Sequence, residues 1–205
     1  MTECRPKRSL NADGVRLEPK HEAAHGGLIE ATRRLQDAVM ASNAPARVLD
    51  EMAQSVADAA DELMNFPADW PNQVAGLQFH LPGRGQVLTP RVYIDELSQH
   101  KIDARWTFTS FYDGGGGVVL GGAVMLVLDE LCGRLANYVS GELARTAFLR
   151  VDFRTVTRIG AELTFQASVD RLEGRKLFIA GSLHDSESLL CDVQGLFIRI
   201  RPGGA

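Results

Sequence analysis

The spacing of hydrophobic residues is helical in the first third of the chain. Apolar positions recur three and four residues apart over about residues 27–40 and again over 46–64. Asn43, Ala44 and Pro45 separate the two runs, and proline suits the start of a helix. This pattern predicts an antiparallel helical hairpin with one apolar stripe on each helix. We expect the hairpin to pack on the main domain or on another copy of itself.

The spacing changes to a period of two further along the chain. Ile102, Ala104, Trp106 and Phe108 alternate with polar residues, which predicts a half-buried strand. Similar runs lie at about 147–154, 163–169, 176–184 and 189–200, and a weaker run lies at about 87–94. A helix of roughly 17 residues is expected after Gly121, ending near Tyr138. One helix against an antiparallel sheet indicates the α+β class.

Three regions follow from these patterns. Residues 1–65 are expected to form an N-terminal arm, loose to about residue 22, followed by the helical hairpin. Residues 66–84 contain Pro67, Pro71, Pro82 and Gly83 and are expected to be a linker. Residues 85–205 are expected to form the main α+β domain.

The segment from Asp113 to Gly133 combines glycines with an acid. Four consecutive glycines lead to Gly121-Gly122, and an apolar helical run with Asp129 in its middle follows. Glycines at a helix start leave amide N–H groups open to an anion or a carbonyl oxygen. A carboxylate in an apolar helix is costly unless it has a partner or a function. The combination indicates acyl chemistry, and neither a GxGxxG spacing nor a following GK[ST] supports a phosphate-binding loop.

Two adjacent acids, Asp129 and Glu130, are candidates for the catalytic residue. Glu130 has Arg134 four residues later, a favourable ion-pair spacing, so a structural role is expected. Asp129 has no cation at helical spacing and lies on an apolar stripe, which suits a general base or a nucleophile. An acid that faces a solvated groove or bonds to a neighbouring loop is the alternative. Cys132 is expected to be a small buried residue, since no histidine lies at a matching spacing.

Gly121 and Asp129 are too far apart to act together from one helix. They are eight residues apart, which corresponds to about 12 Å along a helix. Two antiparallel copies of the helix could bring the Gly121 amide of one chain opposite Asp129 of the other. The hypothesis therefore implies a two-fold dimer with two equivalent sites.

The ordered motifs resemble the hotdog-fold acyl-CoA thioesterases, in particular the PaaI-like branch. Members tend to show a tyrosine–acid–glycine turn and then His-Gly-Gly, six residues and Asp, often followed by Glu and a nearby Gly. The matching residues here are Tyr112-Asp113-Gly114, Leu120-Gly121-Gly122, Asp129-Glu130 and Gly133, with weaker matches at Thr146, Leu149, Glu173–Lys176 and Gly195–Phe197.

The resemblance implies a hotdog fold, an antiparallel sheet wrapped around a long central helix, over residues 85–201. It also implies hydrolysis of an acyl-CoA or related acyl thioester without a cofactor or metal, by a homodimer or homotetramer. Asp129 and the Gly121 amide would be catalytic, and the substrate-binding candidates are Tyr112, Gly117, Leu120, Gly122 and Thr146. Leu120 replaces the usual histidine, so a non-catalytic acyl-binding protein on the same fold is the main alternative.

A metal site is a further alternative. His21-Glu22-Ala23-Ala24-His25 matches the HExxH zinc motif, in which two histidines share a helix face. The motif is followed at once by Gly26-Gly27, where the helix of a zinc protease should continue. No histidine fits the extended spacing of the related metalloproteases either, so the match is expected to be chance.

Composition narrows the class of protein. The 205 residues are 45% hydrophobic and 23% charged with a net charge of −4, as in soluble globular proteins, and no basic stripe suggests a nucleic-acid partner. The longest apolar run is too short to span a bilayer, and no signal peptide is expected. The widely spaced Cys4, Cys132 and Cys191 favour a reduced, cytoplasmic setting.

Overall fold

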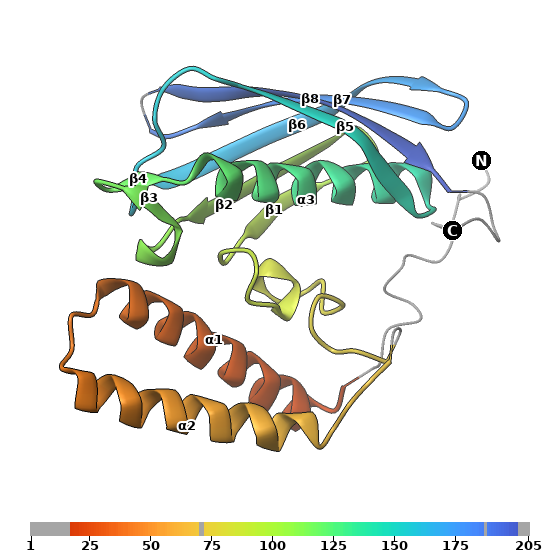
Figure 1. The fold of residues 1–205 in the computed structure, drawn as a ribbon. Helices are drawn as coiled ribbons and strands as arrows, with labels where there is room; N and C mark the ends of the chain where they lie inside the picture. The colour runs from red at the N-terminus through yellow and green to blue at the C-terminus, as the bar shows by residue number, and fades with distance from the viewer. Residues whose placement is uncertain (1–16, 70–71, 187, 201–205) are drawn as a thin grey trace.

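A computed structural model describes residues 17–69, 72–186 and 188–200. Two helices form the N-terminal part, α1 (Pro19–Ala41) and α2 (Ala46–Met64) (Figure 1). The expected bounds of α2 are confirmed, but α1 begins earlier than residue 27, so residues 19–22 are helical and not a loose arm. Pro19 at the first helical position supports this early start, because its fixed φ suits a helix.

The two helices differ in how they meet the rest of the chain. Asp37 of α1 accepts hydrogen bonds from the Ser110 hydroxyl (3.2 Å) and the Phe111 amide (3.0 Å). No residue of α2 is buried, and its apolar stripe of Leu49, Met52, Val56 and Leu63 is exposed. The main domain therefore covers part of α1, and α2 keeps an uncovered apolar face.

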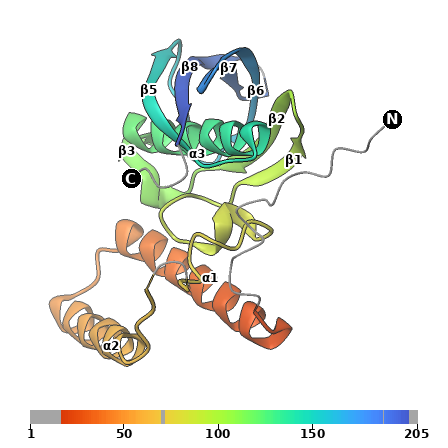
Figure 2. The same cartoon turned by 90° about the vertical axis from the view of Figure 1, so that its right-hand side faces the viewer.

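A six-stranded antiparallel sheet forms the main domain, with strand order β1-β2-β6-β7-β8-β5. The strands are β1 (Tyr93–Leu97), β2 (Lys101–Thr107), β5 (Ala144–Phe153), β6 (Glu162–Glu173), β7 (Lys176–His184) and β8 (Leu189–Arg199). The sheet curves around α3 (Gly121–Ser140), as Figure 2 shows. The predicted α+β class and hotdog architecture are confirmed, and β5 is an edge strand.

One local expectation differs from the structure. The strand expected at about 87–94 lies later, at β1, since Pro90 lacks the amide N–H that a strand would use. The glycine run forms a small hairpin of β3 (Asp113–Gly115) and β4 (Val118–Val119). The Asp113 carboxylate accepts hydrogen bonds from the amides of Gly115 (2.7 Å) and Gly117 (3.4 Å), so the turn is pinned by its own side chain. Two short 3-10 helices, η2 (Pro82–Gly85) and η3 (Ser110–Tyr112), precede this hairpin.

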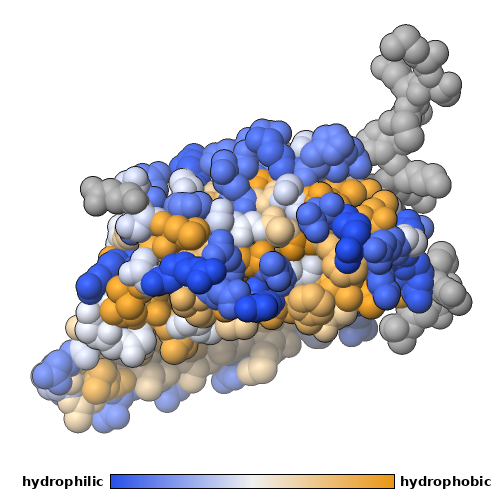
Figure 3. All heavy atoms as spheres, turned by 90° about the horizontal axis from the view of Figure 1, so that it is seen from above, coloured by the Kyte–Doolittle hydropathy of each residue, from blue (hydrophilic) through white to orange (hydrophobic). Residues whose placement is uncertain are grey.

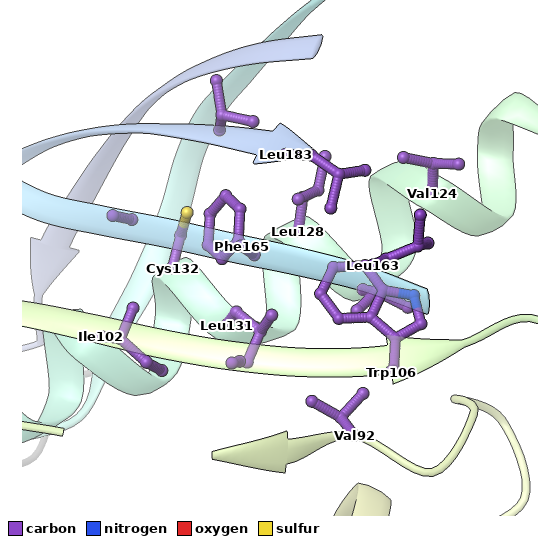
Figure 4. Packing of buried hydrophobic residues seen from close by; sticks show 14 of the residues in the cluster. Val92, Ile102, Trp106, Val124, Leu128, Leu131, Cys132, Leu163, Phe165 and Leu183 are labelled. Atoms are coloured by element: carbon purple, nitrogen blue, oxygen red, sulfur yellow. The ribbon is translucent and has the colours of Figure 1, made fainter. Parts of the chain in front are cut away.

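The core lies between the sheet and one face of α3. Leu128, Leu131 and Cys132 are at most 1% exposed and point toward Phe165 and its neighbours on the sheet (Figure 4). Hydrophilic and hydrophobic side chains are mixed on the outer surface seen in Figure 3. α3 is thus fixed by its apolar face, and the opposite face, which carries Asp129, stays open.

Among the described helices, none has the length and hydropathy needed to cross a bilayer. The boundaries expected at residues 65 and 85 stay a prediction.

Candidate active site

Asp129 and Thr146 meet between the central helix and the edge strand. The Thr146 hydroxyl donates a hydrogen bond of 2.8 Å to Oδ1 of Asp129. Nearby, the Ala144 amide donates to the side-chain oxygen of Asn137 on α3 (2.7 Å), which ties the start of β5 to the helix. Asp129 is half-buried, and Thr146 is exposed. The carboxylate is therefore held by a neutral donor and remains accessible.

A groove of about 330 Å³ runs beside this pair. Three segments line it: α3, the start of β5 and the linker that precedes the sheet. The lining residues include Asp129 and Glu130 from α3, Thr146 and Arg145 from β5, and Leu77, Phe79 and Arg84 from the linker. Asp129 thus faces a recess bounded by parts of the chain that are far apart in sequence.

The ion pair expected within α3 is replaced by one to the linker. Oε1 of Glu130 lies 2.7 Å from Nε of Arg84, so the two side chains form a close ion pair, although its geometry is not that of a hydrogen bond. Arg134 adds a weaker charge interaction with Glu130. Burial raises the pKa of Glu130 above its usual value, although the two arginines oppose this shift. The structural role expected for Glu130 stays a prediction, but its partner is Arg84 instead of Arg134.

Gly121 and Gly122 open α3, where amide N–H groups lack partners within the helix. A Cβ added at Gly121 would meet only the Phe153 ring, at an ordinary contact distance. A Cβ added at Gly122 would meet no atom. Leu120 precedes them and is 59% exposed. The expected donors therefore lie at an open helix N-terminus, and Gly121 and Asp129 lie on the same helix.

The remaining candidates, Tyr112 and Gly117, lie outside the lining of the Asp129 groove. Tyr112 is buried between Phe108 and Phe111, and its hydroxyl donates to the Leu88 carbonyl (3.2 Å). Burial raises the pKa of Tyr112 to about 12. Its carbonyl accepts from the Leu120 amide (2.9 Å), so Tyr112 fixes the start of α3. A second cavity of about 280 Å³, between α1 and the main domain, is lined in part by Tyr112.

The HExxH match lies on α1, which continues through Gly26-Gly27 against expectation. Nε2 of His25 lies 2.9 Å from the Gly85 carbonyl oxygen, and Glu22 lies 3.0 Å from His80. Within the part of the chain that the structure describes, no group of three or more His, Cys, Asp or Glu side chains is placed to hold a metal ion. The contacts assign His25 and Glu22 to packing α1 against the linker and the adjoining Gly85.

Cysteine positions fit a structural role. Cys132 and Cys191 are buried and unpaired, and burial raises the pKa of both thiols. Cys4 lies outside the described residues.

The sequence patterns did not predict that Phe79 and Arg84 of the linker would line the groove. Arg84 has φ +59° between Gly83 and Gly85, which also have positive φ. The Gly-Arg-Gly sequence is a signal for such a turn, but no local pattern gives its contact with α3.

Known proteins resemble part of the main domain. Residues 116–191 match the family model of the thioesterase superfamily. A stretch of 94 residues is 30% identical to the acyl-coenzyme A thioesterase THEM4 of Xenopus laevis. That stretch is 45% of this chain and 42% of the relative, so the match spans less than half of either protein.

Solved structures show the same fold. A crystal structure of a thioesterase superfamily protein matches with a TM-score of 0.73 and 24% identity, over 85% of this chain and 90% of that one. The E. coli PaaI protein from the phenylacetic acid degradation operon matches with a TM-score of 0.51 and 18% identity, over 54% of this chain and 80% of PaaI. The first match extends beyond the sheet and α3, so at least part of the N-terminal region shares its arrangement. The match over residues 116–191 makes this part of the chain similar to the thioesterase superfamily, and the sheet and central helix have the hotdog fold.

Proposed function

We propose that the protein hydrolyses acyl thioesters, with acyl-CoA as the substrate class, and that Asp129 is the general base. The observation that carries this proposal is the Asp129 carboxylate held by Thr146 at 2.8 Å beside an open groove. The similarity of a 94-residue stretch to acyl-coenzyme A thioesterases supports this substrate class, and the residues that match the thioesterase superfamily model include Asp129 and Thr146.

In this reaction Asp129 takes a proton from a water molecule as the oxygen of that water adds to the thioester carbonyl. The carbonyl oxygen becomes an oxyanion in the tetrahedral intermediate. The C–S bond then breaks, the carbonyl re-forms, and the thiolate leaves and takes up a proton. Thr146 bonds to one carboxylate oxygen and leaves the other for the water molecule.

The oxyanion donor is the Gly121 amide of a second copy. Gly121 and Asp129 lie on one helix, about 12 Å apart along its axis, so a single chain does not bring them together. Edge strand β5 and the adjoining face of α3 expose apolar side chains of Leu120, Met125, Phe148 and Phe153, which a second copy could cover. A two-fold arrangement then gives two equivalent sites.

Leu120 favours a second candidate function. The family histidine would polarise the thioester carbonyl, and an exposed leucine supplies no such charge. A hotdog protein that binds acyl thioesters without hydrolysing them would tolerate this substitution.

Thiol release from a series of acyl-CoA chain lengths separates the two functions. The wild-type protein should release CoA, and Asp129→Asn should lower kcat by about 10²–10⁴-fold with the same thermal unfolding curve. The matched control is Asp95→Asn, an exchange on the opposite edge strand β1 at an exposed residue paired with Arg105, away from the groove. Full activity of Asp129→Asn, or binding without release by the wild type, would contradict the proposed hydrolysis.

A further inference from the structure

The wall of the groove opposite β5 is built by the linker. Leu77, Phe79 and Arg84 line the same recess as Asp129 and Thr146. These three residues lie outside the stretch that matches the thioesterase family model, residues 116–191. One side of the groove is therefore built by residues that precede this stretch.

Arg84 is held in an unusual backbone conformation. It is the one non-glycine residue with positive φ (+59°) among those that the structure describes. Such a conformation persists only where the surroundings fix it. Gly83 permits the close approach, because a Cβ there would lie 2.7 Å from both the Pro90 carbonyl oxygen and the Arg33 guanidinium.

Helix α1 holds the segment that follows Arg84, residues 85–89. Arg33 donates hydrogen bonds to the carbonyls of Gln86 (2.6 Å) and Thr89 (3.2 Å), and His25 bonds to the carbonyl of Gly85 (2.9 Å). These backbone contacts directly follow Arg84 in the sequence. The helix that lies outside the hotdog domain thus determines where a groove residue sits.

The groove carries more positive than negative side chains. Arg84, Arg134 and Arg145 line it, against Asp129 and Glu130. Arg84 is paired with Glu130 at 2.7 Å, and the guanidinium groups of Arg84 and Arg134 lie 5.7 and 5.3 Å from the centre of the Phe79 ring. Phe79 therefore supports both cations beside the catalytic carboxylate.

Arg134 has no strong partner of its own. Among the described residues it forms no salt bridge, and its hydrogen bond is to the Phe79 carbonyl at 3.4 Å. A half-buried guanidinium such as that of Arg134 is costly when its donors lack a close anion. Because Arg134 lines the groove, its guanidinium is available to a ligand there.

We propose that the N-terminal region completes the substrate groove and that Arg134, supported by Phe79 and Arg84, binds an anionic group of the thioester. The anion is a phosphate of CoA or a carboxylate on the acyl chain, since both accept the same guanidinium hydrogen bonds. The inference rests on the proposed hydrolysis, because the anion belongs to the substrate of Asp129.

Three thioesters distinguish the two sources of the anion. Butyryl-CoA carries phosphates, butyryl-N-acetylcysteamine carries no charge, and succinyl-N-acetylcysteamine carries a carboxylate on an acyl chain of equal length. Arg134→Gln should raise KM about tenfold for the thioesters that carry the recognised anion and leave KM for the neutral thioester unchanged. The control Arg47→Gln removes the same charge from an exposed position on α2. Equal effects of Arg134→Gln on all three thioesters, or no effect, would overturn the proposal.

The role of α1 as a positioning element has its own test. Arg33→Gln should raise KM for the same thioesters as Arg134→Gln, with kcat for the neutral thioester unchanged, because the loss acts through the segment that follows Arg84. Arg34→Gln, the neighbouring exposed arginine, is the matched control. Unchanged KM values in a folded Arg33→Gln protein would refute this role.

Calorimetry measures binding of the anion independently of hydrolysis. If the wild type releases no thiol, the three thioesters are titrated as stable ligands into wild type and Arg134→Gln. Weaker binding of only the anionic thioesters by the variant would support the anion site even without hydrolysis. Identical affinities in the two proteins would overturn it.

Discussion

The hydroxyl of Thr146 lies 2.8 Å from Oδ1 of Asp129, joining edge strand β5 to the middle of helix α3. A carboxylate oxygen with a fixed donor has a defined orientation, and the second oxygen is left for water. The pair therefore acts in our proposal as a positioned base, with Thr146 as the residue that orients it.

Thr146→Val removes the donor and keeps a similar shape. We expect kcat for acyl-CoA to fall about tenfold, because a hydrogen bond to a charged group is lost from the reacting carboxylate. Thr146→Ser keeps the hydroxyl and should retain most of the activity. Steady-state thiol release measures both, and equal rates in the Val and Ser variants would show that the hydroxyl does not orient the base.

Gly121→Pro tests the amide donor at the start of α3. Proline suits the first position of a helix and lacks the N–H, and the extended backbone of Leu120 (ψ 123°) is compatible with a following proline. We expect this variant to fold and to lose at least about 10²-fold in kcat. Gly121→Ala keeps the N–H and meets only the Phe153 ring at 3.6 Å, so it is the matched control.

Mixing two inactive variants tests whether the site is shared between copies. When Gly121→Pro and Asp129→Asn chains are unfolded together and refolded, each mixed dimer contains one site with both groups intact. Activity should return to about a quarter of the wild-type value for random pairing. If no activity returns although mixed dimers are detected, donor and base belong to the same chain.

The buried Glu130 should make stability depend on pH. Burial raises its pKa above the ordinary value of 4.5, so the native protein retains a proton that the unfolded chain has released. Its contribution to the free energy of unfolding should therefore fall as pH rises above 4.5. Urea unfolding over a pH series should show that the free energy of unfolding of the wild type, minus that of Glu130→Gln, decreases as pH rises. A difference that increases would mean that the ion pair with Arg84 outweighs burial.

The thiol of Cys132 should be unreactive in the native protein. Burial raises the pKa of its thiol and hides it from reagents. We expect no alkylation of Cys132 by iodoacetamide until the protein is unfolded, as judged by mass spectrometry. Cys132→Ala should keep thiol release and cost about 1 kcal/mol of stability through the small cavity that it leaves. Loss of hydrolysis in a folded variant would instead indicate a nucleophile.

Some local signals could be read directly from the sequence. The period-two runs gave the strands around Phe165 and Trp106, and the helical run gave α3, because burial of one face imposes these spacings on the chain. The bounds of α2 followed in the same way from its apolar stripe. Local backbone effects were harder to predict, since tertiary contacts allowed α1 to continue through Gly26-Gly27 at a cost of about 1 kcal/mol for each glycine.

The sequence by itself determined that one apolar helix carries an acid, Asp129, after a glycine start, because periodicity and helix capping are local properties. Only the tertiary structure decided which groups surround that acid. Thr146 reaches it across a strand, and Arg84 reaches its neighbour Glu130 from the linker. Such contacts depend on how elements distant in sequence pack together, and no spacing within one element specifies them.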